Sequence, residues 1–282
     1  MTRKPAVAGA FYEGSSLRLR EQISNCYQHR LGPGKIPEIS ESAERTLIGL
    51  VVPHAGYMYS GPVACHSYAE LAKDGKPEAA IILGPNHTGM GTGVSIETEG
   101  DWITPLGKVE IESSIANEIL KNSQFLEEDS SAQEKEHSVE VQVPMIQFLY
   151  DKSVKIVPIV IMLQYLEVCK DLSAAIAKVV KERKVIIIAS SDFTHYEPAN
   201  IAREKDKRAL ANIERLEGEE LLRTVERDNI SMCGPGPVAT TLLAAKQLGA
   251  QSSQILKYST SGDVTGDLQS VVGYGAAKIV RA

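Results

Sequence analysis

The sequence has no long apolar run, no clustered basic stretch and no closely spaced pair of cysteines. Its longest apolar run, at about 156–163, is interrupted by Pro158 and is far shorter than the roughly 20 residues that a membrane-spanning helix requires. The apolar stretch that follows Arg3 and Lys4 is too short for a secretory signal. We therefore expect no membrane partner.

Cysteine is scarce, and the four cysteines (Cys26, Cys65, Cys169 and Cys233) are scattered. This pattern favours a reducing, cytoplasmic location over a disulfide framework. A net charge of −6 without a basic stretch predicts that nucleic acid is not a partner. The 282 residues are 43% hydrophobic and 23% charged, which argues against disorder and allows a large core. Because nothing divides the chain clearly, we predict one domain over 1–282.

Three short apolar runs each lead into a polar segment that carries a histidine. The runs and the residues after them are 47–52 with His54, 79–84 with Asn86 and His87, and 185–189 with Asp192 and His195. Such runs are typical of buried strands. Ligands of open α/β sheets bind just beyond the carboxyl ends of strands, so these histidines stand where functional groups are expected.

Stretches with helical spacing alternate with the apolar runs. We predict helices at 15–27, 62–72, 113–122, 137–150, 166–181, 198–216, 219–227 and from about 238 to 248, and further strands at 94–98, 102–111, 154–162, 254–260 and 270–280. Residues 32–44 and 129–136 are predicted to be loops. The alternation indicates an α/β fold, a layered αβα arrangement with a central mostly parallel or mixed sheet.

Histidines that are distant in sequence can form a metal site together with a cysteine. Imidazole binds zinc, copper, iron or nickel, and thiolate adds softness; the simpler alternative is that each histidine only forms hydrogen bonds at a strand end. Cys233 precedes a predicted helix, whose N-terminus would lower the pKa of the thiol. The thiolate could then bind metal or act as a nucleophile, and the alternative is a small buried apolar residue.

Two carboxylate–histidine pairs have a three-residue spacing. Asp192 and His195 would face each other if the backbone turns helically there, and the carboxylate would then fix the tautomer of a general base. The alternative is that Asp192 caps the next segment. His137 and Glu140 have the same spacing, with a solvated helix start as the alternative.

The motifs around these residues resemble those of the Memo family. They are PHAGYMYSG around His54, LGPNHTG around His87, EHSVEVQVP around His137, SSDFTHY around Asp192 and His195, and MCGPGP around Cys233. The likeness runs from AVAGAFY near the N-terminus to VVGYGAAKIV near the C-terminus. It therefore covers nearly the whole chain.

The resemblance implies a fold similar to the catalytic subunit of class III extradiol dioxygenases, which are non-haem iron enzymes. It implies that His54, His87 and Cys233 form the metal site, with His195 as acid/base and Asp192 beside it. The residues that it adds to the pocket are His137, Glu140, Phe11, Tyr57 and Asn86. Phe11 stands where the animal sequences carry tryptophan.

The ligand set bears on the cofactor. Extradiol dioxygenases complete their iron site with a carboxylate, and Cys233 at that position shifts the preference towards zinc or copper(I). We expect a metal-dependent redox enzyme that uses iron or copper. The alternatives are a zinc hydrolase and a non-catalytic module that binds a peptide or a protein.

The resemblance also implies partners. Microbial members form one component of the AmmeMemoRadiSam system, alongside a radical-SAM protein. Animal members are described as adaptors in receptor-tyrosine-kinase-driven cell motility, with phosphopeptide binding ascribed to this pocket. For this chain, the expected ligand is a small molecule or a peptide held in the pocket.

Overall fold

Strands and helices alternate along most of the chain in the computed structural model, which describes residues 2–41 and 45–281. The strands are β1 (Thr2–Arg3), β2 (Leu47–Val52), β3 (Ala79–Pro85), β4 (Val94–Ile96), β5 (Asp101–Thr104), β6 (Gly107–Glu110), β7 (Glu127–Glu128), β8 (Lys155–Ile161), β9 (Val185–Ser190), β10 (His195–Glu197), β11 (Ser252–Thr260) and β12 (Val271–Val280). The helices are α1 (Ser16–Gln28), α2 (Tyr57–Lys73), α3 (Ser113–Asn122), α4 (Ser131–Glu134), the 3₁₀ turn η1 (Glu140–Gln142), α5 (Val143–Tyr150), α6 (Leu166–Val180), α7 (Ala199–Glu214), α8 (Gly218–Arg227), α9 (Pro235–Gln247) and α10 (Gly262–Thr265).

Four parallel strands, in the order β2-β9-β3-β8, form the centre of the main sheet. β12 pairs antiparallel with β2, and β4 pairs antiparallel with β8, so the sheet is mixed. β10 and β11 both pair with β12, and β7 lies beyond β4. A separate small sheet joins β1, β5 and β6. The predicted α/β class with a mostly parallel or mixed sheet is confirmed.

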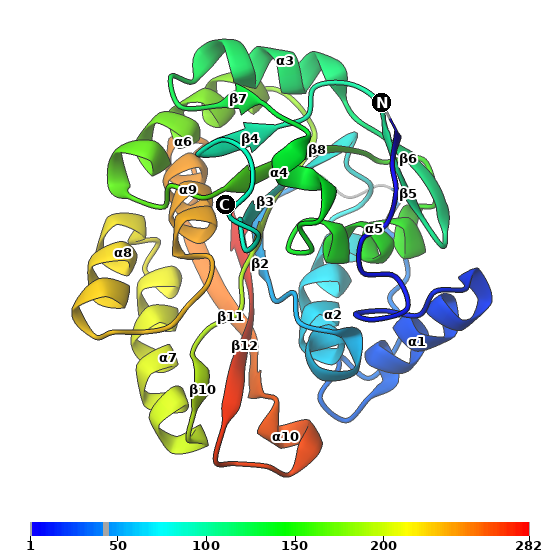
Figure 1. The fold of residues 1–282 in the computed structure, drawn as a ribbon, viewed down its shortest axis with the longest axis vertical. Coiled ribbons are helices and arrows are strands. Elements are labelled where there is room, and N and C mark those ends of the chain that lie inside the picture. The colour runs from blue at the N-terminus through cyan, green and yellow to red at the C-terminus, as the bar shows by residue number, and fades with distance from the viewer. Residues whose placement is uncertain (1, 42–44, 282) are drawn as a thin grey trace.

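Helices cover both faces of the sheet. α1, α2 and α5 lie on one side, at the right in Figure 1, and α6 to α9 lie on the other. α2 packs on β2, β11 and β12, whereas α9 packs on β2, β3 and β9. Strands enclosed on both faces read as continuous apolar runs, which explains why every residue of β2, β3 and β9 is buried.

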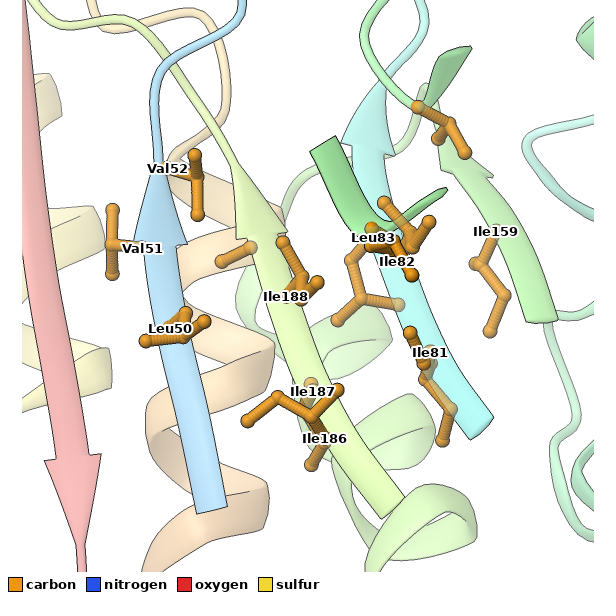
Figure 2. Close-up of a cluster of buried hydrophobic side chains, with 14 of the residues drawn as sticks. Leu50, Val51, Val52, Ile81, Ile82, Leu83, Ile159, Ile186, Ile187 and Ile188 are labelled. Carbon is orange, nitrogen blue, oxygen red and sulfur yellow. The ribbon is translucent and has the colours of Figure 1, made fainter. Parts of the chain in front are cut away.

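The core is densest where these strands lie side by side. Leu50, Ile82 and Ile188 are fully buried on three neighbouring strands (Figure 2). Each such side chain contributes about 1.5–3 kcal/mol through burial. A rigid sheet centre of this kind can hold the loops at its carboxyl edge in place.

Across the described residues, no helix combines the length and the apolar content needed to cross a membrane.

Several predicted elements differ in detail. The strand predicted at 102–111 is the hairpin of β5 and β6, which turns through Gly107 at a φ of 118°. A turn with a positive φ favours glycine, and alternation of side chains does not reveal it. The helix predicted at 62–72 begins earlier, at Tyr57, with Pro62 inside it. Ser15 caps α1, because its side chain accepts a hydrogen bond from the backbone N–H of Arg18.

Two further segments depart from the predictions. The predicted loop at 129–136 contains the short helix α4, and the helix predicted at 137–150 is divided into η1 and α5. Proline near the start of α5 fits a first helical turn. The loop predicted at 32–44 has no helix or strand over 32–41, and 42–44 lie outside the described residues. That the chain forms one domain stays a prediction.

Candidate metal centre

The carboxyl ends of β2, β3 and β9 meet at one edge of the sheet, because these strands are parallel neighbours. His54 lies two residues beyond β2, and His87 lies two residues beyond β3. Both side chains line a cavity of about 660 Å³, to which His137 and His195 also contribute. Four of the chain's six histidines therefore face one cavity.

Three of these histidines form a compact cluster that could hold a metal ion. One ring nitrogen each from His54, His87 and His137 lies within 4.8 Å of the others. The rings of His87 and His137 are stacked with centroids 4.5 Å apart, and the ring of His54 stands edge-on to both. Three imidazole donors fit zinc, copper or iron.

The tautomer of His54 follows from its hydrogen bonds. Ser190 Oγ donates its single proton to the backbone oxygen of Ser138 at 2.6 Å and accepts a hydrogen bond from Gln142 Nε2 at 2.8 Å. His54 Nδ1, 2.9 Å from the same oxygen, must therefore be the donor. Its Nε2 therefore carries the lone pair. Burial, with smaller contributions from the neighbouring histidines, holds the pKa of His54 far below its usual value, so the ring is neutral.

A buried carboxylate, that of Glu136, fixes the orientation of the His87 ring. Glu136 Oε1 lies 2.9 Å from His87 Nδ1, and Oε2 accepts the backbone N–H of His87. An ionised carboxylate only accepts, so Nδ1 of His87 carries a proton, which in the neutral ring makes Nε2 the metal-binding nitrogen. Burial alone would raise the pKa of Glu136, but hydrogen bonding and charge interaction with His87 outweigh it and bring the pKa to about 2.

His137 completes the cluster from the segment before η1. Its Nδ1 lies 3.3 Å from Glu136 Oε1, and its ring packs against the ring of Phe11 with centroids 4.7 Å apart. Burial lowers the pKa of His137 to about 4, although the charge of Glu136 opposes the shift. His54 and His137 are thus both neutral near pH 7, the state in which imidazole binds metal.

Cys233 lies beside His54, with its Sγ 3.3 Å from His54 Nε2. Asp192 donates a backbone hydrogen bond to this sulfur at 3.2 Å. Burial first, and then the charge of Asp192, raise the pKa of Cys233 well above its usual value, which is opposite to the effect expected of the helix N-terminus and favours the alternative of a small buried residue. The cluster of three metal-binding groups found among the described residues contains His137 where the resemblance implied Cys233.

Asp192 and His195 both line the cavity, but they do not form the predicted pair. The backbone between them is not helical. Asp192 Oδ1 instead accepts the backbone N–H of His54 at 2.8 Å, and burial raises the pKa of Asp192 to about 6. His195 Nδ1 donates to the backbone oxygens of Phe193 and Ser231 at 2.7 and 2.8 Å. Two carbonyls, and not a carboxylate, thus orient the ring of His195 through Nδ1.

The other predicted pocket residues separate into two groups. Phe11 lines the cavity, whereas Glu140, Tyr57 and Asn86 do not. Glu140 is fully buried in an ion pair with Arg3 at 2.7 Å. The Tyr57 hydroxyl donates to a backbone oxygen of η1. Asn86 caps its own loop, accepting N–H groups at Oδ1 and donating from Nδ2 to the backbone at position 90.

Two residues that position the cluster were missed by reasoning from the sequence. Glu136 directly precedes His137 within the EHSVEVQVP motif, and Ser190 is the last residue of β9. A carboxylate next to a candidate ligand was a usable signal for Glu136. Nothing local distinguishes Ser190 from any serine at a strand end.

Fold and site together define an α/β protein with a cavity in which a histidine cluster could hold a metal ion. The sequence profile described as Memo-like protein matches residues 3–278. A MEMO1 family protein of Methanopyrus kandleri is 46% identical over 278 residues, covering 98% of both chains. Another, from Methanothermobacter thermautotrophicus, is 47% identical over 276 residues, covering 97% of this chain and 99% of that protein. The chain belongs to the Memo-like family.

A solved structure shares the fold. The crystal structure of an uncharacterized protein from Escherichia coli K12 matches 82% of this chain and 99% of its own, with a TM-score of 0.51 and 14% sequence identity. At that identity the likeness concerns the fold alone.

Proposed function

We propose that this protein is a metal-dependent redox enzyme that holds iron or copper at the histidine cluster. The observation that carries the proposal is the convergence of His54, His87 and His137 within 4.8 Å at the wall of a 660 Å³ cavity. The donor set fits these metals, because neutral imidazole binds both and a nearby thiol adds preference for copper(I). When bound, such a metal supplies one-electron chemistry.

The residues around the site would have separate roles in binding the metal and in transferring protons. Ser190 and Glu136 form hydrogen bonds with Nδ1 of His54 and of His87, respectively. These bonds would orient each ring so that its Nε2 binds the metal. Cys233 and His137 both lie next to His54 and would complete the ligand set. His195, held through Nδ1, keeps Nε2 available to give or take a proton in the cavity.

Metal analysis tests this proposal. Protein purified anaerobically under reducing conditions should contain close to one iron or copper per chain. The double variant His54→Ala/His87→Ala should contain almost none. His29→Ala, which changes a histidine outside the cavity wall, is the matched control and should retain full occupancy. Equal metal content in the double variant and the wild type would end the proposal.

Spectroscopy separates the two candidates for the remaining ligand. If the Cys233 thiolate binds the metal, the copper(II)- or iron-loaded protein should show a sulfur-to-metal absorption band that Cys233→Ser removes. If His137 alone completes the site, Cys233→Ser should leave the absorption spectrum unchanged and His137→Ala should lower the metal content.

A zinc hydrolase is the second candidate, and the set of three histidines favours it. Catalytic zinc sites commonly have three protein ligands and an open position, and the chemistry that zinc supplies is a lowered pKa, about 7, for a bound water. Zinc as the purified metal, with an absorption spectrum that does not respond to dioxygen, would favour this candidate over the redox enzyme.

A further inference from the structure

The cavity wall carries acidic and aromatic side chains but no fixed positive charge. Among the described residues that line it there is no lysine or arginine, whereas Asp192 and Asp267 contribute carboxylates. Arg203, on the neighbouring helix α7, is paired with Asp263 and lies outside the wall. Taking an anionic group out of water without a cationic partner is costly. Away from the histidine cluster, the cavity is therefore unsuited to anions.

Tyr196 adopts an unusual backbone conformation beside this cavity. Its φ of 60° lies in the left-handed region, which a bulky residue seldom adopts. The pairing of β10 with β12 shifts register between His195 and Glu197, which makes Tyr196 the bulged residue. Neighbouring side chains of a regular strand point to opposite faces. Here His195 and Tyr196 both line the cavity, with ring centroids 5.7 Å apart.

The bulge therefore turns an aromatic ring towards the cavity and leaves it uncovered. Tyr196 is 77% exposed although it belongs to the wall, which places it at the mouth. Bulges near functional sites commonly redirect a side chain, and strained backbone conformations cluster at active sites and ligand-binding sites. The faces of aromatic rings attract cations. Asp267, also exposed and in the wall, supplies a negative charge at the same cavity.

We propose that the outer part of this cavity binds the ammonium group of a small organic cation. Tyr196 would offer its ring face and Asp267 its carboxylate, while the apolar body of the ligand points inwards to the histidine cluster. A volume of about 660 Å³ lies within the range of about 300–1,000 Å³ typical of small-molecule sites. The inference deepens the proposed function, because it names the substrate class for the same cavity.

Three probes of matched size test the charge preference. Phenethylamine, phenethyl alcohol and phenylacetate differ mainly in being cationic, neutral and anionic at pH 7. Calorimetric titration would be carried out on metal-free and zinc-loaded protein. The amine should bind about fivefold more tightly than the alcohol in both forms, as expected for a cation–π contact. Phenylacetate should bind the metal-free protein most weakly.

Variants at the mouth identify the residues responsible. Tyr196→Leu and Asp267→Asn should each reduce the affinity for the amine about two- to fivefold and leave the affinity for the alcohol unchanged. Tyr196→Phe keeps the ring face and should behave like the wild type. Tyr165→Leu is the matched control, because Tyr165 is an exposed tyrosine outside the cavity wall.

Three results would overturn the inference: equal affinities for amine and alcohol, tighter binding of phenylacetate to the metal-free protein, or no binding of any probe. The last two would direct attention to an anionic ligand or to a macromolecule instead. Metal content decides the proposed function separately, because it depends on His54 and His87 and not on Tyr196 or Asp267.

Discussion

Replacing Glu136 by glutamine tests whether one buried carboxylate keeps the histidine cluster ready to bind metal. Glu136 is 1% exposed. Its oxygens accept hydrogen bonds from His87 Nδ1 and from the backbone N–H groups of His87, His137 and Ser138, at 2.5 to 2.9 Å. The side chain thus ties the loop after β3 to the segment before η1, and these two segments carry two of the three histidines.

Glutamine cannot reproduce this set of hydrogen bonds. It has one accepting oxygen and one NH₂ group, so in either orientation the NH₂ group faces an N–H donor. With NH₂ at the Oε1 position, the His87 ring must move its proton to Nε2, the nitrogen that the metal needs. Loss of such an outer partner lowers metal affinity by about 10–100-fold, equivalent to about 1.4–2.7 kcal/mol. The unpaired buried donor should lower the free energy of unfolding by about 1–3 kcal/mol.

Competition with a chelator at pH 7 would measure the zinc dissociation constant, and denaturant unfolding of the metal-free protein would measure stability. Glu134→Gln is the matched control, because Glu134 is an exposed carboxylate two residues away and should change neither quantity. A folded Glu136→Gln protein that binds zinc within twofold of the wild type would refute the argument that this carboxylate orients the histidines.

Three further outcomes are expected. Ser190→Ala removes the oxygen that accepts the proton of His54 Nδ1, so zinc affinity should fall about tenfold; an unchanged dissociation constant would contradict the tautomer assigned here. The pKa of Glu136 is depressed from 4.5 to about 2, so its stabilising contribution is complete above about pH 4.5 and is lost as the pH falls towards 2. Unfolding measured across that range should therefore show the stability of the wild type approaching that of Glu136→Gln, and a constant difference would count against the depressed pKa. Ile188→Ala should cost about 2–5 kcal/mol of stability through the cavity that it leaves in the sheet, whereas Ile36→Ala, at a 40% exposed position, should cost less than about 0.5 kcal/mol; similar losses at both positions would contradict the burial that separates them.

Much of the fold can be predicted from local sequence patterns. The runs that became β2, β3 and β9 are apolar throughout, and a strand buried on both faces needs little else for its identification. Because parallel strands end at the same sheet edge, the exits of these runs also predict that His54 and His87 lie near each other. The hairpin of β5 and β6 was missed, because its turn depends on the φ of Gly107 and not on alternation.

The roles of particular polar residues could not be predicted in this way. Glu140 shares the spacing of a catalytic pair with His137, yet its carboxylate binds Arg3, 137 positions earlier in the chain. Asp192 holds the backbone of His54, and the predicted partner His195 is fixed by carbonyl groups instead. A buried polar group takes whichever partner the packing brings within about 3 Å, and that partner is usually distant in sequence.

Hydrophobic periodicity and strand exits are local properties, so the amino-acid order is sufficient to establish the layered α/β class and the edge of the sheet at which the histidines gather. The proton positions on those histidines, the entry of His137 into the cluster and the turning of Tyr196 towards the cavity depend on contacts between segments far apart in the chain. Such contacts exist only once the core has packed, which is why the folded molecule was needed to see them.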